Sequence, residues 1–292
     1  MTTYANNVTV AAAIDSEIVP MFTAAAIMPN LVAAYNIDIP NTNAKRVPKS
    51  GAITASVVAE AVAASPQAVV DTSLLLTLQK AVVLTNPSVE ALRFASNGAN
   101  TVRHTALAAQ ACADKFDVDA CALSNGLSQV VDSGVALTVA KLQEAAFTLR
   151  LAKLPDTRAA AVLHVKQAYQ LESDMRASGS AIYGNPNFKL DAAQGAGQSM
   201  RGYKGTLFGV EIWETTNCYV DTAPTPDDNV GMVICPSFCL AALYPEGSAP
   251  SFQTEIDASV DFKSGIVNVR TYMWYALGEL SDAAGVGLKS DI

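Results

Sequence analysis

The sequence predicts an α+β fold organised around one long helix. The helix prediction rests on apolar residues, most of them small, that recur at steps of three and four over residues 86–121. A long strand hairpin is predicted over residues 45–85, where apolar and polar residues alternate on either side of a turn signal. The third observation is a series of strand-like segments after residue 206, separated by Pro, Asp and Gly turns. A long helix with a ribbon and sheets is a poor core for a compact enzyme and suits a flat molecule.

Residues 1–44 form the predicted N-terminal arm, with a short helix expected around Ser16 to Ala26. An arm that is apolar but not periodic is expected to dock, either on its own body or on a neighbour. Asp15 and Glu17 precede the apolar run, where a signal peptide would carry positive charge. We therefore expect a protein that is made and kept in the cytosol, or assembled there.

Residues 45–85 are predicted to form two antiparallel strands. The first strand is expected over Ile53–Glu60, and Ser65–Gln67 supplies the turn signal. The second strand presents Leu74, Leu76 and Leu78 on one face. An isolated two-stranded ribbon is only marginally stable in water, so this one needs a body or a partner subunit to lie on.

The central helix is expected to begin at Asn86-Pro87, with Asn at the N-cap and Pro at the first helical position. Asn97-Gly98 is a candidate kink, and Ser124-Asn125-Gly126 is the expected stop. The predicted apolar face consists of Val89, Leu92, Ala95, Ala99, Val102, Ala106, Ala109, Ala113 and Phe116. The residues assigned to the other faces are Arg93, Asn100, Arg103, Gln110, Asp114 and Asp117.

The second half of the chain predicts another helix followed by strands. The helix is expected over Val135–Leu154, with Leu142, Ala145, Ala146, Leu149 and Ala152 on one side and Pro155 ending it. A buried strand over Ala159–Val165 leads into a helical turn, and Ser178–Tyr203 is a polar loop. The later predicted strands are Thr206–Tyr219, Gly231–Tyr244, Gln253–Phe262 and Ile266–Ala276.

Composition narrows the function classes. Of 292 residues, 50% are hydrophobic and 16% charged, which is typical of a packed globular protein. The formal net charge of −8 disfavours a protein that grips nucleic acid and reads its sequence. No run of about 18 uninterrupted apolar residues is present, so no membrane span is predicted.

The cysteines are expected to be buried free thiols in a reducing cytoplasm, because their number is odd and no CxxC pair exists. They are Cys112, Cys121, Cys218, Cys235 and Cys239.

No catalytic, cofactor-binding or metal-binding residue is predicted. The two histidines, His104 and His164, accompany no GxSxG nucleophile motif and are expected to be core or solvated residues. Gly195-Ala-Gly197 lacks the third glycine of a dinucleotide fingerprint and follows a polar loop instead of a strand.

An aspartate cluster and the two tryptophans each have a structural interpretation and a functional one. Asp221, Asp227 and Asp228 could form a cation site, but EF-hand spacing is absent and an exposed acidic turn is favoured. Trp213 and Trp274 lie in strand patterns and are expected to anchor either the core or an interface.

The order of these elements resembles the major capsid proteins of tailed bacteriophages, which have the Hong Kong 97-type fold. The resemblance covers nearly the whole chain. Leu76–Lys80 followed by Asn86–Leu92 is similar to that family's extended loop running into its spine helix. The other similar segments are Ala159–Leu171, Gly205–Thr215 and Ile266–Tyr272.

The resemblance implies a wedge-shaped shell subunit. It implies an arm (1–44), an extended hairpin loop (45–85), a peripheral domain (86–135 and 250–270) and an axial domain (136–249 and 271–292). The loop would lie over a neighbour, which would help to cover its leucine face. Some family members cross-link Lys to Asn; Lys49 and Lys80 lie in the loop, but nothing in the sequence indicates that chemistry.

The implied partners are further copies of the chain in pentamers and hexamers, together with portal, scaffolding and decoration proteins. The shell would enclose double-stranded DNA without sequence-specific binding and without a membrane. It would assemble in the host cytoplasm and end in the virion. No propeptide-like segment precedes the arm, so scaffolding is expected on another chain, or the chain is a processed form.

Two alternatives stay open. One is an encapsulin-type bacterial compartment, which would enclose a cargo enzyme instead of DNA. The other is a cytosolic hydrolase or oxidoreductase on an α+β fold, which is weakened by the missing nucleophile, base and cofactor motifs.

Overall fold

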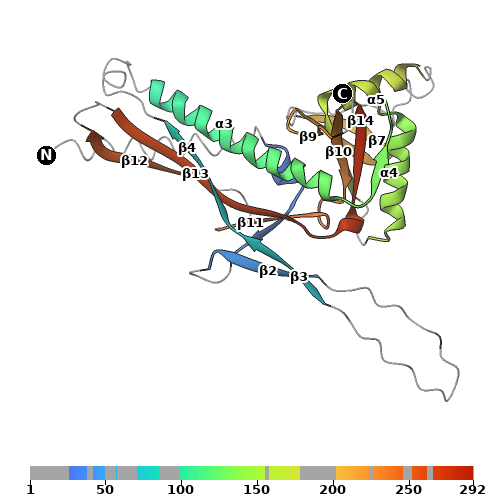
Figure 1. The fold of residues 1–292 in the computed structure, drawn as a ribbon, viewed down its shortest axis with the longest axis horizontal. Helices are drawn as coiled ribbons and strands as arrows, with labels where there is room; N and C mark the ends of the chain where they lie inside the picture. The colour runs from blue at the N-terminus through green and yellow to red at the C-terminus, as the bar shows by residue number, and fades with distance from the viewer. Residues whose placement is uncertain are drawn as a thin grey trace.

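The structure, a computed structural model, describes residues 26–37, 42–49, 57, 71–85, 99–154, 158–177, 202–223, 227–245, 252–261 and 266–291. Within these ranges the chain forms two sheets, a separate two-stranded ribbon and three α-helices (Figure 1). The long helix α3 lies along one sheet, and the two shorter helices lie on the other.

The first sheet is built around one long strand, β13, and every strand but one in it is antiparallel to its neighbour. Its order is β1-β11-β13-β12, and β4 pairs with β13 beyond the end of β11. β1 joins β11 in parallel, which brings residues of the predicted arm into the sheet. The strands are β1 (Ala33–Asn36), β4 (Gln79–Thr85), β11 (Leu240–Tyr244), β12 (Phe252–Asp261) and β13 (Ile266–Glu279).

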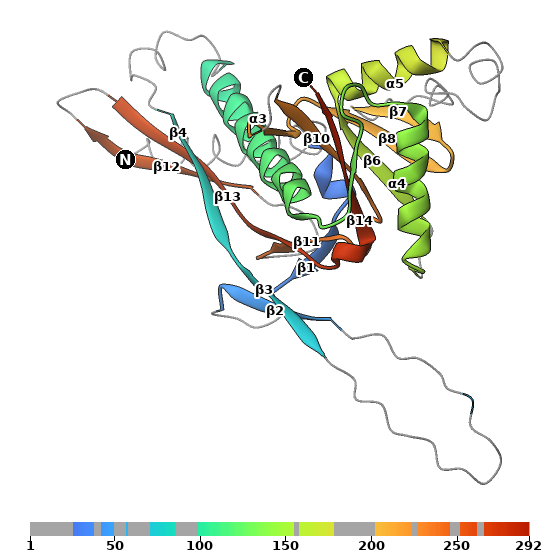
Figure 2. The ribbon, with the colours of Figure 1, turned by 45° about the vertical axis from the view of Figure 1, so that its right-hand side comes forward.

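The second sheet has the order β5-β14-β10-β6-β8-β7, with β9 paired to β10. The helices α4 and α5 lie against this sheet (Figure 2). Its strands are β5 (Val130–Asp132), β6 (Ala159–His164), β7 (Tyr203–Leu207), β8 (Val210–Thr215), β9 (Tyr219–Asp221), β10 (Asp228–Ile234) and β14 (Gly285–Asp291). The helices are α4 (Val139–Leu151) and α5 (Val165–Ala177).

The central helix α3 spans Ala99–Ala122 in the described residues. Ala109, Ala113 and Phe116 are fully buried, which confirms that part of the predicted face. The helix ends in a 3-10 turn, η3 (Leu123–Gly126), at the predicted stop. The predicted start at residues 86–87 and the candidate kink at residues 97–98 lie outside the described residues.

One residue assigned to a polar face of α3 lies in the core. The sequence placed Asp117 among the residues on the other faces, but its exposed fraction is 1%. The reason is a specific partner: the carboxylate accepts backbone hydrogen bonds from residues 27 and 28, which helical periodicity cannot reveal.

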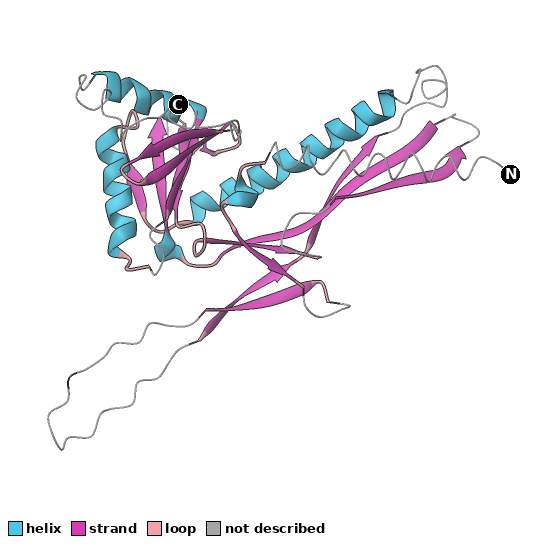
Figure 3. Cartoon of the chain, turned by 180° about the vertical axis from the view of Figure 1, so that it is seen from behind, coloured by secondary structure: helices cyan, strands magenta, loops and turns pink. Residues whose placement is uncertain are grey.

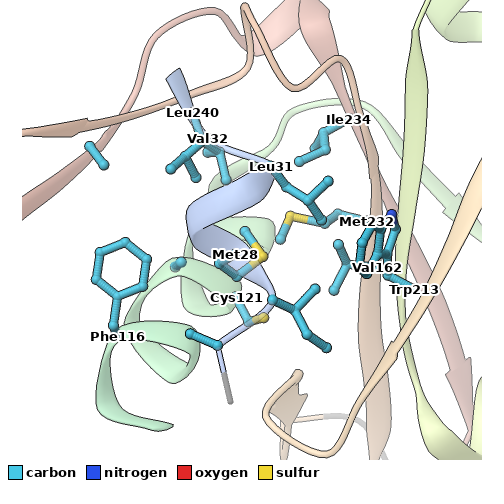
Figure 4. Packing of buried hydrophobic residues seen from close by; sticks show 14 of the residues in the cluster. Met28, Leu31, Val32, Phe116, Cys121, Val162, Trp213, Met232, Ile234 and Leu240 are labelled. Carbon is cyan, nitrogen blue, oxygen red and sulfur yellow. The ribbon is translucent and has the colours of Figure 1, made fainter. Parts of the chain in front are cut away.

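The main core lies between α3, the first sheet and one face of the second sheet. Close to its centre is the 3-10 turn η1 (Met28–Asn30), whose Met28 is fully buried together with Leu31 (Figure 4). Phe116 of α3 and Trp213 of β8 belong to the same cluster. The described end of the arm therefore docks on its own body.

The other face of the second sheet packs against α4 and α5 in a separate cluster. Thr138 caps α4 by accepting from the Lys141 N–H at 3.4 Å. Four of the five predicted face residues of α4 are buried, and Ala152 is half-buried. The buried strand and the helical turn predicted after it are present as β6 and α5. Residues 178–201 of the predicted polar loop lie outside the described part.

The prediction of an antiparallel two-stranded ribbon is correct, but the residues predicted for its first strand are wrong. The ribbon pairs β2 (Ala44–Lys49) with β3 (Thr72–Thr77) in antiparallel register. Val57 belongs to no strand, and the rest of the predicted strand Ile53–Glu60 lies outside the described residues. The second predicted strand divides at Leu78, because β3 pairs with β2 whereas β4 pairs with β13.

The leucine face of this ribbon is also covered differently from the expectation. Leu76 is only 2% exposed, and it packs within the same chain against Val47, Leu243 and Ala276. Leu74 and Leu78 pack against the same cluster. Within the chain this face packs against β11 and β13, because the ribbon crosses the end of the first sheet (Figure 3), and Leu74 and Leu78 stay half-buried.

Candidate assembly surfaces

The arm is fastened to the long helix by one buried carboxylate. Asp117 Oδ2 accepts from the N–H of Ile27 at 3.0 Å, and Oδ1 accepts from the N–H of Met28 at 3.1 Å. These two amides belong to the start of η1 and have no partner within that short turn. Asp117 thus fixes the position of residues 27 and 28 of the arm against α3.

The ribbon and β4 present apolar side chains to solvent. Leu75, Val82 and Leu84 have exposed fractions of 53%, 46% and 57%. Val82 and Leu84 lie on the face of β4 that points away from α3, since Ala81 and Val83 pack into the main core. Val82 and Leu84 lie side by side on β4, and neighbouring exposed apolar side chains are typical of surfaces that contact other proteins.

Aromatic residues of β13 adjoin the same face. Lys80 lies across from Trp274 in the strand pairing, and its Nζ stands 3.8 Å from the centroid of the Tyr272 ring and 5.3 Å from that of Trp274. Trp213, in contrast, is 4% exposed and belongs to the main core. Trp213 therefore lies in the core, which is one of the two expected positions. Trp274 is half-buried beside an exposed face.

The ribbon is tied to the first sheet at the Lys49–Thr72 end, away from its root at Ala44 and Thr77. Lys49 Nζ donates to the Glu279 carbonyl oxygen at 3.0 Å. A cavity of about 380 Å³ lies beside the root, between α3 and β4. Within it Tyr275 Oη donates to Asp119 Oδ2 at 2.6 Å, and Lys115 Nζ lies 2.6 Å from the other oxygen of that carboxylate. Burial, followed by this carboxylate, raises the pKa of Tyr275, so the phenol keeps its proton.

The helices of the second sheet carry another exposed apolar group. On α4, Phe147 and Leu151 are 61% and 62% exposed and share one side of the helix at a spacing of four. Tyr169 of α5 is 68% exposed. The opposite sides of both helices pack into the core of the second sheet. Phe147, Leu151 and Tyr169 therefore contribute little to the packing of the subunit.

The predicted acidic turn is partly buried. Asp227 is exposed as expected, but Asp228 is 7% exposed and stands across from Asp221 and Asp291 on the neighbouring strands. Lys289 Nζ lies 2.8 Å from Asp221 Oδ2. The hydrogen bond from Lys289 lowers the pKa of Asp221, whereas burial, Asp132 and Asp291 raise the pKa of Asp228.

His164 has a structural role in the described residues. Its Nδ1 accepts from the Lys166 N–H at 3.2 Å, where β6 passes into α5. Partial burial and the nearby Lys166 lower its pKa, so the ring is neutral at pH 7. The side chain of His104 and the segment 195–197 lie outside the described part.

The described residues contain no group of three His, Cys, Asp or Glu side chains placed to hold a metal ion. Among the helices of the described ranges, none is both long and apolar enough to cross a membrane.

All five cysteines are free and buried, as predicted. Two of them touch: the thiols of Cys121, on the last turn of α3, and Cys218, after β8, share a hydrogen bond. That contact, followed by burial, raises the pKa of Cys121. Burial alone raises the pKa of Cys112 to about 11.

Several solved structures with the same architecture are phage capsids. The capsid of the cyanophage P-SCSP1u matches with a TM-score of 0.63 at 13% identity, over 91% of this chain and 88% of that one. The capsid of Ralstonia phage GP4 matches with a TM-score of 0.68 at 10% identity, over 89% and 86%. The chain has the Hong Kong 97-type capsid fold.

The Hong Kong 97-type fold also extends beyond phage. The SrpI encapsulin of Synechococcus elongatus PCC 7942 matches with a TM-score of 0.61 at 13% identity, over 88% of this chain and 85% of that one. No family model and no curated protein sequence matches the chain.

Sequence reasoning missed three features of these surfaces. It placed Asp117 on a polar face, and it took Asp228 as exposed although this residue begins the apolar strand β10. It also missed the contact between Cys121 and Cys218, for which sequence spacing holds no signal.

Proposed function

We propose that the chain is the major capsid protein of a tailed bacteriophage, the self-assembling subunit of an icosahedral head that encloses double-stranded DNA. The observation that carries the proposal is a fold shared with phage capsids over about nine-tenths of both chains. The exposed apolar groups support it, because they need partners that a monomer does not supply.

In this proposal the role is structural instead of catalytic. Many identical chains make closely related contacts, and subunit curvature closes the shell. Leu75, Val82 and Leu84 would contact one neighbour, and Phe147 with Leu151 another. Portal, scaffolding and decoration proteins are proposed as further partners, and the shell would assemble in the host cytoplasm and become part of the virion.

We further propose the division into peripheral and axial domains. The peripheral domain would consist of α3 with the sheet of β1, β4, β11, β12 and β13, and the axial domain of the second sheet with α4 and α5. The boundary expected between residues 270 and 271 falls inside β13. In this proposal all of β13, and β11 with it, belongs to the peripheral domain.

The second candidate is an encapsulin-type compartment. The observation that favours it is the SrpI encapsulin match, whose TM-score of 0.61 is close to the 0.63 of the cyanophage P-SCSP1u capsid. The two functions differ in content, since a phage head holds DNA and an encapsulin holds protein cargo.

The test is to produce the full chain, measure its size and image it by cryo-electron microscopy. We expect closed megadalton shells under some assembly condition, alone or with co-expressed partner proteins of the same genome. Shells from the natural source should contain DNA, and protein cargo without DNA would favour the encapsulin function. A stable small oligomer that never forms shells, even with those partners, would overturn both.

A further inference from the structure

We propose that Asn229 of β10 and Ser290 of β14 bind one buried water molecule on the face of the second sheet that α4 and α5 cover. The Asn229 Nδ2 and Ser290 Oγ atoms are both shielded from solvent, and neither has a hydrogen-bond partner among the residues that the structure describes. The exposed fractions of the two residues are 1% and 0%. A buried polar group without a partner is costly, so two of them in one place point to a bound ligand.

The strand register brings the two side chains together. Asn229 and Ser290 are direct partners in the antiparallel pairing of β10 with β14. Residues opposite one another in such a pair point to the same face of the sheet, with their Cβ atoms about 4.5–5.5 Å apart. Val233, Val286 and Leu288 alternate in step with them and belong to the cluster that α4 and α5 fill. The two unpaired atoms therefore face the same small region beneath the helices.

A buried amide of α5 lies beside this region. Gln167 is fully buried, and its Nε2 donates to the carbonyl oxygens of Asn229 at 2.9 Å and Leu288 at 3.1 Å. Its Oε1 accepts from the His164 N–H at 3.1 Å. Both N–H donors of the Gln167 amide are thus used by the backbone. Gln167 makes the surroundings of the pair polar without donating to either side chain.

One water is the ligand that fits this chemistry. A water both accepts and donates, so it can accept from Asn229 Nδ2 and donate to Ser290 Oγ at the same time. Neither side chain is charged, and an ion buried between neutral groups is costly. Buried waters in globular proteins typically make roughly two to four hydrogen bonds to polar groups that otherwise lack partners. The water would link β10 to β14 close to the start of the first strand and the end of the second.

The direct test is a cryo-electron microscopy or crystal map of the full chain at a resolution that shows ordered waters. We expect a density peak within hydrogen-bond distance of both the Asn229 amide and Ser290 Oγ. Oxygen-17 magnetic relaxation dispersion of the unassembled full chain counts its long-lived internal waters in solution. The wild type should hold one more of them than the double variant Asn229→Leu/Ser290→Ala, in which both polar groups are replaced.

Thermal unfolding distinguishes a hydrated pair from a dry one by the sign of one change. In the wild type, Ser290→Ala removes one partner of the water and should lower the melting temperature. In the Asn229→Leu background the larger apolar side chain displaces the water and leaves the Ser290 hydroxyl unpaired, so Ser290→Ala should raise the melting temperature. Ser173→Ala, at an exposed position of α5, is the control and should have the same effect in both backgrounds.

Three outcomes would overturn the proposal. The first is a melting temperature that rises with Ser290→Ala in the wild type, since this means a dry and unpaired hydroxyl. The second is a map in which the two side chains bond each other, or another residue, with no water between them. The third is an equal number of long-lived waters in the wild type and the double variant. All of these measurements concern one folded chain, so they are independent of whether shells form.

Discussion

At the scale of single residues, Asp117 is the side chain with the largest expected effect on stability. Asp117→Ala leaves the buried N–H groups of Ile27 and Met28 without their acceptor. We expect the free energy of unfolding to fall by about 2–5 kcal/mol, since each unsatisfied buried group is costly. Urea unfolding measures it, and Asp114→Ala, on the same helix and half-buried, is the control. Equal losses for both variants would rule out the proposed fastening of the arm.

Asp228 makes a pH-dependent contribution with a definite sign. Burial, Asp132 and Asp291 raise its pKa above the ordinary value of 3.8, although Lys289 acts in the opposite direction. The folded chain therefore holds this proton more tightly than the unfolded chain. The resulting stabilisation is present at low pH and is lost as the pH rises through the folded-state pKa.

Asp228→Asn should imitate the protonated carboxyl. The variant should melt above the wild type at neutral pH, and the difference should shrink as the pH falls toward the ordinary pKa of Asp. Asp221, whose pKa is lowered, has the opposite dependence in both proteins and cancels in the comparison. Thermal unfolding at a series of pH values measures the difference, with Asp227→Asn as the exposed control. A difference that is constant with pH would contradict the assignment.

At the scale of elements, the two faces of β3 should behave oppositely. Leu76→Ala removes a side chain buried within its own subunit and should lower the free energy of unfolding by about 2–5 kcal/mol. Leu75→Asp changes the neighbouring exposed residue and should leave the unassembled subunit nearly as stable as before, while reducing shell formation. Denaturant unfolding of the subunit and size measurement of particles report the two effects. Loss of subunit stability with Leu75→Asp alone would reverse the assignment of faces.

Helices were predicted better from the sequence than strands. The apolar periodicity of α4 identified Leu142 and Leu149 correctly, because a helix buries one face through local spacing. β2 was missed because Arg46, Pro48 and its lysines look unlike a strand, and β14 because glycines weaken its pattern. Strand pairing depends on distant partners, which no local pattern contains.

The candidate surfaces were less predictable than the fold. A sequence pattern identifies which residues are apolar, but whether Leu76 meets its own chain or a neighbour depends on where the ribbon crosses the first sheet. Side chains such as Asp117 and Cys121 follow the same logic, since their partners are about 90 or more residues away.

At the scale of the whole molecule, the exposed stripe of α4 is expected to contribute to assembly. Phe147→Asp places a charge on a side chain that is 61% exposed and contributes little to the subunit's core. Melting of the free subunit should be nearly unchanged, whereas closed shells should be absent or open, because a dry contact excludes a charge. Thr216→Asp, exposed in the turn between β8 and β9, is the control. Normal shells from Phe147→Asp would exclude this stripe from the contacts.

The strand β13 has a mechanical consequence. Its 14 residues pair with β12 and β4 toward one end and with β11 toward the other, so a single continuous backbone spans the first sheet. A pull along this strand loads its hydrogen bonds side by side, and they must rupture together, whereas a pull across it would open them one at a time. A container under pressure from within stretches its wall along the surface. Where β13 lies in the plane of that wall, the tension pulls along the strand, which is the direction in which its hydrogen bonds resist most.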